Sequence, residues 1–525
     1  MQGEARELLE PLLFLEGNAL PPLPFAPGEA PDRSGLAEEL AITNRAFGHP
    51  RAQELAQRLK DPATRVVVTG QQAGLFGGPL YTLSKAVAAA RWAAALEASG
   101  VPAVAVFWVA TEDHDFDEVA SATFLARQGP HSVSLGEDPQ PLLPVGMRTL
   151  GPAVESLLID LGEQIPNPRF IRWLETLARW YRPSARFGEA FQRLLPRLLG
   201  AQSPLMLDSQ SPALKAAQQP WLERLVRERE ALDENLAAAH DAVSSAGLPL
   251  QIHPQPGVSP LFLLRGEQRR RIQWSQLDPA ADRFSLRGED GQQEASVETL
   301  LEALADNPGV VSPGALARPA IQDAVLGTTL QVLGPGELSY MVQAAGVHRT
   351  LGLPGAAVTL RPQALILDQR QLDHLQELKV PLELLLGDEG TLQRHLAQQA
   401  GAEVVPPAAQ RIDEILAQLE GQVLAVDANL DRPIQRTRGQ ITKALEQLQN
   451  KVNGAVARGD EVKKRRLEGL REAVLPGGKL QERALSTAHF PGKYGAGLAE
   501  ALWQQLDLDG RWLQVIVPDP SGDDA

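Results

Sequence analysis

Two short polar stretches carry residue types that could do chemistry. The first is the glycine-rich stretch TGQQAGLFGGPLYTLSK, and the second is the acidic stretch TEDHDFDE. Glycines let a backbone approach a ligand closely, and the first amides of a helix attract an anion. We therefore expect the first stretch to hold a carboxylate or phosphate through the following residues: Gln71, Gln72, Gly74, Gly77, Gly78, Tyr81, Thr82 and Lys85.

The glycine-rich stretch differs from both common phosphate-binding motifs. A P-loop needs a glycine, four residues and then Gly-Lys-Ser/Thr, whereas a dinucleotide fold needs G-x-G-x-x-G. Neither pattern is present in this stretch. The alternative to ligand binding is a tight turn in which the glycines are structural.

The acidic stretch begins directly after an apolar run. Carboxylates this close together repel one another unless a cation or hydrogen-bond donors compensate. Their types suit general acid–base catalysis, Mg²⁺ coordination, or recognition of an amine or hydroxyls. We assign these functions to Glu112, Asp113 and His114, with Asp113 or His114 as the general base. We expect Asp117 and Glu118 to lie on a solvated helix start, where carboxylates are favoured.

A third polar region contains the motifs ARPAIQD and GPGELSYM. The first supplies Arg318 as a fixed cation, and the second supplies Gly336, Glu337 and Tyr340. We treat these residues as further candidates for substrate or nucleotide binding. The basic run Arg269–Arg271 is predicted to be a solvated face, and we assign no residue as a resident metal ligand.

The elements around these stretches predict how they are positioned. Residues 66–68 read as a short buried strand, residues 85–99 as an alanine-rich helix, and residues 103–110 as a second buried strand. Strand, helix and strand in this order predict a βαβ unit with parallel strands. Because the carboxyl ends of parallel strands meet at one edge of the sheet, we expect the glycine-rich and acidic stretches to lie side by side.

Composition excludes several classes of protein. A chain of 525 residues is too long for one compact core, and its net charge of −15 argues against nucleic-acid or anionic-membrane partners. The absence of cysteine excludes disulfides, thiolate zinc sites and a cysteine nucleophile. No apolar run is long enough to span a bilayer, and the acidic start MQGEARELLE is unlike a signal peptide, so we expect a cytoplasmic protein.

The pattern along the chain predicts three parts. Residues 1–400 are expected to form a Rossmann-like core with insertions at about 145–235 and 245–300. Residues 405–478 carry apolar positions at 3-4 spacing, which favours a coiled-coil helical domain that forms a homodimer. A helix packed on its own domain is the alternative. Residues 479–525 are expected to return to the core.

Five segments together resemble one family, the cysteine-adding ligases of bacillithiol biosynthesis (the BshC family). The matching segments are TGQQAGLFGGPLYTLSKA, VFWVATEDHDFDEV, SPGALARPAIQD, GPGELSYM and LQER, and the resemblance covers essentially the whole chain. It implies a Rossmann-like core similar to class I aminoacyl-tRNA synthetases and nucleotidylyl transferases, with two connecting-peptide insertions and a dimerising coiled-coil arm. It also implies a reaction that joins cysteine by an amide bond to the amino group of glucosaminyl malate, the last step of bacillithiol biosynthesis, with ATP as the expected nucleotide. Mg²⁺ is a further expected cofactor because of the acidic stretch.

The chain departs from the synthetases in its signatures. The first strand–helix turn carries GPLYTLSK in place of His-x-Gly-His, and no lysine-rich signature loop follows. Without cysteines, the chain must also select its thiol substrate differently from related ligases that use zinc. Two alternatives therefore stay open: a non-catalytic ligand-binding or scaffold protein, and a Mg²⁺-dependent glycosyl or nucleotidyl transferase.

Overall fold

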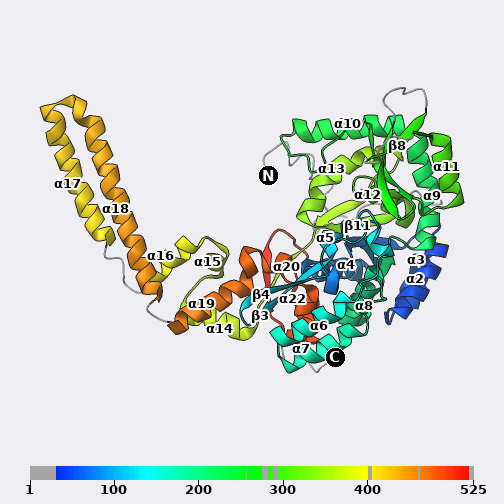
Figure 1. The fold of residues 1–525 in the computed structure, drawn as a ribbon, viewed down its shortest axis with the longest axis horizontal. Coiled ribbons are helices and arrows are strands. Elements are labelled where there is room, and N and C mark those ends of the chain that lie inside the picture. The colour runs from blue at the N-terminus through cyan, green and yellow to red at the C-terminus, as the bar shows by residue number, and fades with distance from the viewer. Residues whose placement is uncertain are drawn as a thin grey trace. The chain divides into compact units, whose positions relative to one another are not determined.

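A five-stranded parallel sheet lies at the centre of the first part of the chain (Figure 1). The computed structural model describes residues 31–255, 257–274, 282–287, 294–399, 405–458 and 461–519. The sheet order is β12-β11-β1-β2-β5, formed by β1 (Arg65–Gln71), β2 (Ala103–Val109), β5 (Leu205–Asp208), β11 (Thr328–Leu333) and β12 (Ala357–Leu360). All neighbouring strands pair in parallel, which confirms the α/β Rossmann-like core.

Helices cover both faces of this sheet. Every residue of β2 is buried, as expected for a strand of a parallel sheet enclosed on two sides. The alanine-rich helix α4 (Tyr81–Ala98) packs on one face against Val67, Ala105 and Leu330. The opposite face is covered by α2 (Ser34–Ala46), α3 (Ala52–Leu59) and α9 (Pro212–Arg227).

The strand order creates a crevice between β1 and β11. From β1 the chain moves outward through β2 and β5, and it then returns to the other side of β1 to add β11 and β12. The loops after β1 and β11 consequently leave the sheet in opposite directions. In open α/β sheets, ligands bind at such a switch point, at the carboxyl ends of the strands.

Insertions follow β2 and β5. The first holds the hairpin β3 (Ser121–Ala126) and β4 (Gly129–Ser134) and the helices α5 (Phe116–Val119), α6 (Ala153–Gln164), α7 (Pro168–Ala178) and α8 (Phe187–Leu199). The range predicted for the first insertion, about 145–235, includes β5, which the structure places in the core sheet. A four-residue strand bordered by long helices gives too short an apolar pattern to be recognised as a core strand.

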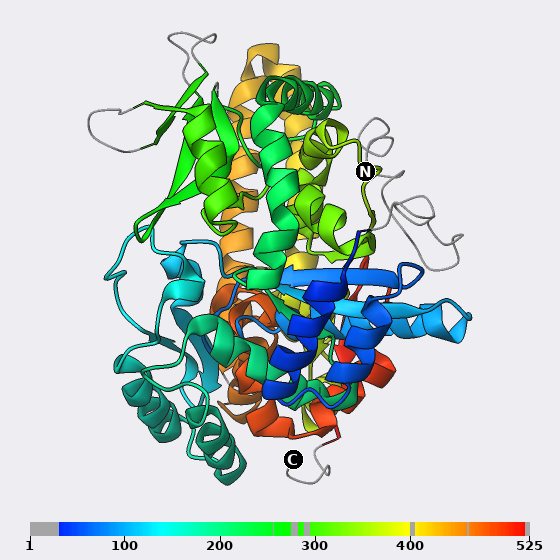
Figure 2. The same cartoon turned by 90° about the vertical axis from the view of Figure 1, so that its right-hand side faces the viewer.

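The second insertion contains an antiparallel sheet of order β10-β6-β7-β8-β9, whose strands lie beside the helices of this insertion (Figure 2). Its elements are α10 (Arg229–Ser245), β6 (Val258–Arg265), β7 (Gln268–Trp274), β8 (Arg283–Leu286), β9 (Ala295–Ser296), α11 (Val297–Asp306) and β10 (Val311–Pro313). Two helices of the core flank β11, namely α12 (Arg318–Leu326) and α13 (Pro335–Thr350).

The C-terminal segment belongs to the same compact unit as the core, which comprises Met1–Ile366 and Glu482–Ala525. It contains α21 (Pro491–Tyr494), α22 (Gly497–Gln505) and β14 (Leu513–Ile516), and β14 pairs in parallel with β13 (Gln363–Ile366). Arg361 and Glu482 form a bidentate ion pair with both N–O distances at 2.7 Å, and both side chains are fully buried. This pair ties the returning segment to the end of β12.

Replacing Glu482 with glutamine is expected to destabilise the protein by about 3–5 kcal/mol, because the buried Arg361 guanidinium would lose its compensating charge. Urea unfolding followed by circular dichroism measures this change. Glu155→Gln, at an exposed position of α6, is the matched control. A loss below about 1 kcal/mol for Glu482→Gln, the range of an exposed pair, would contradict the assignment.

His489 makes stability depend on pH. It is buried beside Phe124 and Phe490, and burial lowers its pKa from 6.5 to about 3. Below pH 6.5 the His489 imidazole is therefore protonated in the unfolded chain but stays neutral in the folded protein. The free energy of unfolding consequently falls as the pH decreases toward 3. Between pH 7.5 and pH 5.0 this group is expected to remove about 2 kcal/mol. Urea unfolding at the two pH values should show a correspondingly smaller difference for His489→Gln than for the unsubstituted protein; equal differences would exclude this role.

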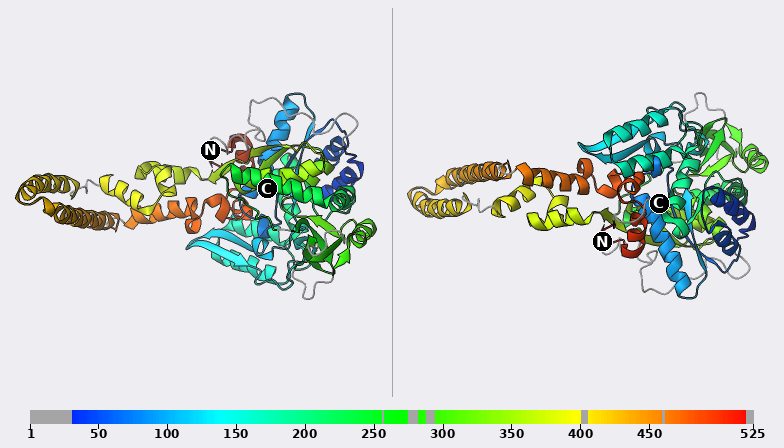
Figure 3. Two further views of the ribbon diagram at one scale, coloured as in Figure 1. Left: turned by 90° about the horizontal axis from the view of Figure 1, so that it is seen from above. Right: turned by 90° about the horizontal axis from the view of Figure 1, so that it is seen from below.

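The second compact unit, Leu367–Gln481, is helical. Its described helices are α14 (Gln369–Leu378), α15 (Leu382–Leu386), α16 (Glu389–Gln399), α17 (Val405–Val426), α18 (Asp431–Arg458) and α19 (Glu461–Val474). Helices α17 and α18 form an antiparallel hairpin and lie side by side in both views of Figure 3. Arg438 on α18 bridges Asp413 and Glu420 on α17. The predicted coiled coil is therefore present, within a unit that starts at residue 367 rather than 405.

Among the described helices, none combines the length and apolarity needed to cross a membrane.

Candidate active site

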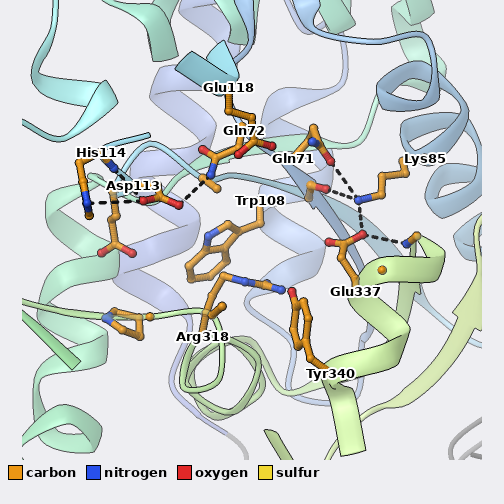
Figure 4. A pocket seen from close by; sticks show the side chains of 18 of the residues that line it. Gln71, Gln72, Lys85, Trp108, Asp113, His114, Glu118, Arg318, Glu337 and Tyr340 are labelled. Atoms are coloured by element: carbon orange, nitrogen blue, oxygen red, sulfur yellow. Dashed lines mark hydrogen bonds and ion pairs between the residues drawn. The ribbon is translucent and has the colours of Figure 1, made fainter. Parts of the chain in front are cut away.

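A cavity of about 560 Å³ opens at the switch point, where β1, β2 and β11 end (Figure 4). The three polar regions of the sequence meet here. The predicted residues that line this switch-point cavity are Gln71, Gln72, Tyr81, Lys85, Glu112, Asp113, His114, Arg318, Gly336, Glu337 and Tyr340.

The glycine turn itself does not line the cavity, and neither does Thr82. Gly77 and Gly78 donate their amides within the turn, to the carbonyls of Gly74 and Leu75. A Cβ atom on Gly77, whose φ is +87°, would lie 2.3 Å from Leu194 Cδ2. The turn is therefore packed beneath protein, and the expectation that Gly74, Gly77, Gly78 and Thr82 hold an anion gives way to a structural role for the glycines.

The Lys85 ammonium makes its hydrogen bonds to other residues of the protein rather than to an external anion. Its ammonium donates to the Gly70 carbonyl (2.7 Å), to Gln71 Oε1 (3.1 Å) and to the Glu337 carboxylate. An ammonium has three N–H donors, so each one has a partner. Because Lys85 is fully buried, it fixes the end of β1 against the start of α13.

Glu337 caps α13 and faces the cavity. Its Oε2 accepts from the Gly334 amide (2.8 Å) and from Lys85, whereas Oε1 points into the cavity (Figure 4). Burial alone would raise the pKa of Glu337, but the ammonium of Lys85 and its hydrogen bond hold this pKa below the ordinary value. The carboxylate is therefore ionised at neutral pH.

Arg318 and Tyr340 form the floor of the cavity below Trp108 and point toward each other (Figure 4). Arg318 Nη1 donates to Gln322 Oε1 at 2.8 Å, which holds the guanidinium near the first turn of α12. Burial raises the pKa of Tyr340, so its hydroxyl keeps its proton at neutral pH. The pair offers hydrogen-bond donors to an anionic or hydroxyl-rich ligand.

Asp113 and His114 lie at the carboxyl end of β2. Asp113 Oδ2 accepts from Gln72 Nε2 at 3.0 Å, and Oδ1 lies 3.5 Å from Arg269 Nη1. Arg269 Nη1 also lies 3.4 Å from His114 Nδ1. Burial and then the Arg269 charge lower the pKa of His114, so its imidazole is neutral at neutral pH and able to accept a proton. Both side chains are partly exposed to the cavity.

Glu112 differs from its two neighbours because it is already committed to a cation. Its side chain is 7% exposed and forms an ion pair with buried Lys215. Its backbone amide donates to Ser209 Oγ at 3.0 Å. These contacts join the ends of β2 and β5, which favours a positioning role for Glu112 and leaves Asp113 and His114 as candidate bases.

Arg269 contradicts the prediction of a solvated basic face. Its side chain is 6% exposed, donates to Ser312 Oγ (2.9 Å) and to the Pro313 carbonyl (3.0 Å), and stacks 3.7 Å from the centre of the Phe262 ring. Arg271, on the same face of β7, also lines the cavity. Alternate residues of a strand share one face. Because three consecutive arginines occupy both faces, the sequence does not indicate which of them are buried.

Other lining residues also escaped prediction. Arg361 and Arg483 contribute further cations, and Trp108 contributes an indole whose nitrogen is buried with no partner among the described residues. Glu118 lies at the cavity wall, where burial, Asp115 and Asp113 raise its pKa. The Asp115 side chain accepts a hydrogen bond from the Glu118 amide and caps α5, so a helix does begin at the acidic stretch.

Charge balance in the cavity favours anionic ligands. The lining contains six basic side chains, Lys85, Arg269, Arg271, Arg318, Arg361 and Arg483, against four acidic ones, Glu112, Asp113, Glu118 and Glu337. Two of these charges are neutralised by residues that do not line the cavity. Lys215 pairs with Glu112, and Glu482 pairs with Arg361. Within the described ranges, no group of three or more His, Asp or Glu side chains is arranged to hold a metal ion.

A cavity at the switch point of a parallel α/β core, together with a helical coiled-coil unit, defines a Rossmann-like ligand-binding protein with a coiled-coil domain. Residues 26–362 match the model of the Rossmann-like N-terminal domain of bacillithiol biosynthesis BshC, and residues 364–515 match the model of its C-terminal coiled-coil domain. The chain therefore belongs to the BshC family of bacillithiol biosynthesis.

Relatives extend over nearly the whole chain. A protein of Salinibacter ruber is 31% identical over 501 residues, which is 92% of this chain and 89% of the relative. A protein of Thermus thermophilus is 30% identical over 89% of this chain and 95% of its own, and one of Chlorobaculum tepidum is 28% identical over 90% and 86%. Each relative carries the name "Putative cysteine ligase BshC".

Proposed function

We propose that this protein is a ligase that joins the carboxyl group of cysteine to the amino group of glucosaminyl malate through an amide bond. The observation that carries the proposal is the cation-rich cavity at the switch point, with the partly exposed Asp113–His114 pair at its edge. Family membership and the names of the relatives support the same reaction.

Binding of the sugar substrate follows from the charges of the cavity. The malate group carries two carboxylates, and Arg318 and Arg483 offer guanidinium groups suited to them. No carboxylate of the described residues forms an ion pair with Arg483, so its charge is available to a ligand. Gln71, Gly336 and Tyr81 line the same space and suit sugar hydroxyls.

The acylation step needs a proton acceptor. An amine that attacks an activated carboxyl group must lose a proton as the amide forms. In the proposed site, Asp113 accepts a hydrogen bond from the amine and His114 takes up the proton. The neutral state of His114 and the fixed orientation of Asp113 by Gln72 support these roles.

Activation of the cysteine carboxylate by ATP is part of the proposal. The arginines of the cavity could bind phosphates, whereas the amides of the glycine turn are bonded within the protein. We propose that Mg²⁺ enters together with ATP, and that the reaction takes place in the cytoplasm, where ATP is supplied.

Incubation of the purified protein with cysteine, glucosaminyl malate and ATP tests the proposal. Mass spectrometry should detect a thiol with the combined mass of the two substrates less one water. With ¹⁸O in the cysteine carboxylate, label in AMP would indicate adenylation, and label in phosphate would indicate phosphorylation. No product from folded protein would favour the scaffold alternative, whereas metal-dependent transfer from a nucleotide sugar would favour a transferase.

We also propose a homodimer through the α17–α18 hairpin. Ile415, Leu419 and Leu448 are 61%, 42% and 50% exposed on this hairpin, although they are apolar. A second copy of the hairpin would cover them. Ile415→Lys combined with Leu419→Lys is expected to give a monomer in sedimentation velocity at micromolar concentration. If the unsubstituted protein already sediments as a monomer, the proposed dimer is wrong.

A further inference from the structure

A second cavity of about 380 Å³ lies under α10 and meets the switch-point cavity at one residue, Arg271, which lines both. We call it the side cavity. Leu236, Ile252 and Leu316 give it apolar walls. Its polar side chains are Asp233, His240, His253, Gln255, Ser259 and Arg271.

His240 is a buried imidazole for which the fold supplies no partner. Its side chain is at the wall of the side cavity, the residue is 7% exposed, and both ring nitrogens are buried without a hydrogen bond to any residue that the structure describes. Buried polar groups of this kind normally have a partner, so a lone one beside a cavity points to a ligand. Burial lowers the pKa of His240 and keeps its ring neutral.

Asp233 lies one helical turn before Ala237 and two before His240, on the cavity side of α10. Burial raises its pKa to about 6, although the charge of Arg229 opposes this shift. Arg229 forms its ion pair with Asp282 instead. A half-buried carboxyl group without an ion pair to any described residue is suited to a ligand ammonium, which would lower its pKa again.

Arg271 supplies the cation of the side cavity. It extends from β7, and its guanidinium lies 4.8 Å from the centre of the Phe262 ring. Asp113 lies close enough to influence the pKa of Arg271, which burial lowers overall. A carboxylate bound by Arg271 would therefore lie at the junction of the two cavities, on the side where Asp113 is located.

We propose that the side cavity binds the amino acid substrate, with Arg271 on its carboxylate, Asp233 on its ammonium and His240 beside its thiol. This inference rests on the proposed ligase function and names the substrate of this part of the site. The carboxyl group would be presented at the junction, where the amine of the second substrate approaches from the switch-point cavity. Arg271, which touches the substrate in this arrangement, is then a catalytic residue, and Asp233 and His240 determine specificity.

The same arrangement accounts for thiol selection without zinc. A thiol is a weak hydrogen-bond donor and packs well against apolar groups. Neutral His240 offers an acceptor nitrogen, and Leu236, Ile252 and Leu316 surround the space with aliphatic carbon. The hydroxyl of serine, by contrast, would lose water to enter an apolar environment with one acceptor.

Isothermal titration of L-cysteine and three analogues into the full-length protein tests each contact separately. Cysteamine lacks the carboxylate, 3-mercaptopropionate lacks the ammonium and L-serine lacks the thiol. The dissociation constant of each analogue is expected to be at least about tenfold higher than that of cysteine, because each analogue lacks one group that contacts the protein. Asp233→Asn should reduce the affinity for cysteine about tenfold but leave the affinity for 3-mercaptopropionate unchanged. Arg271→Gln should reduce the affinity for cysteine by the same factor but leave the affinity for cysteamine unchanged.

Two controls keep the result specific. Glu234→Gln changes an exposed carboxylate next to Asp233 on α10 and should bind cysteine normally. Asp233→Asn should also bind glucosaminyl malate as the unsubstituted protein does, which reports an intact fold. Equal loss of cysteine affinity in Asp233→Asn and Glu234→Gln, or unchanged cysteine affinity in both Asp233→Asn and Arg271→Gln, would overturn the proposal.

His240→Phe provides a second, independent readout, because it keeps an apolar ring and removes the acceptor. The preference for L-cysteine over L-serine should fall about tenfold or more. An unchanged preference in a folded variant would remove His240 from the proposal. These binding measurements need no turnover, so a failure of ligation with cysteine still bound at Asp233 would reject the proposed reaction and retain the amino acid site.

Discussion

Asp113→Asn is expected to reduce the rate of amide formation by about 100- to 10,000-fold, the range for loss of general-base catalysis, because Asp113 orients the amine toward His114. Asparagine keeps an oxygen that can accept from Gln72 Nε2, but it cannot hold the negative charge that steers a proton to His114. It also leaves Arg269 without its nearest charge in the cavity. The rate is measured as thiol product formed from cysteine, glucosaminyl malate and ATP.

The fold should survive this substitution, because the Asp113 side chain is 42% exposed and Arg269 keeps its hydrogen bonds to Ser312 and to the Pro313 carbonyl. Thermal unfolding is expected to change by less than about 1 kcal/mol in equivalent free energy. Asp117→Asn, at an exposed position of α5, is the matched control and should retain full activity. Normal product formation by a folded Asp113→Asn variant would remove Asp113 from the mechanism.

Lys85→Met should abolish activity and also destabilise the fold by about 2–3 kcal/mol, because it removes the buried ammonium and leaves the partly exposed Glu337 carboxylate without its cation. The Gly70 carbonyl and Gln71 Oε1 would lose their donor as well. The ends of β1 and α13 would then no longer be held together at the cavity. Urea unfolding gives the stability, and the product assay gives the activity.

A second substitution separates charge from geometry. Glu337→Gln in the Lys85→Met background removes the uncompensated charge while keeping an acceptor for the Gly334 amide. This double variant should regain a substantial part of the lost stability, as expected when a buried ion pair is replaced as a whole. It should stay inactive. Stability losses of the two single substitutions that simply add in the double variant would show that the two charges do not interact.

The positions of the predicted strands and of α4 follow from local sequence. The apolar run that became β2 and the alanine-rich run that became α4 each satisfy one hydrophobic pattern over their length, so local propensity and burial agree. The order of these elements then predicts parallel pairing and one shared edge. For this reason the meeting of Gln72 with Asp113 at the cavity follows from the sequence.

The roles of single side chains depend on partners that lie far apart in the chain. Lys85 meets Glu337 after 252 residues, and Glu112 meets Lys215 after 103. No pattern near either lysine indicates that its charge is used within the protein. Likewise, the packing of Thr487 over Gly77 requires the C-terminal segment to return, which explains why the glycine turn resembled a ligand loop.

Buried arginine is the hardest feature to predict. Arginine side chains mostly lie at the surface of proteins. Arg269 is nevertheless buried beside the cavity, because Ser312 and the Pro313 carbonyl accept its hydrogen bonds and the Phe262 ring stacks on its guanidinium. These acceptors come from two strands of the inserted sheet whose pairing is set by the tertiary fold. The same pairing places Arg271 between the two cavities.

A crystal structure of the protein with glucosaminyl malate bound tests the proposed location of the active site. We predict that the ligand occupies the switch-point cavity, with its malate carboxylates against Arg318 or its neighbouring arginines and its amine within hydrogen-bond distance of Asp113. Glucosaminyl malate bound elsewhere on the molecule, or bound in this cavity with its amine directed away from Asp113 and His114, would show that these residues do not form the proposed active site.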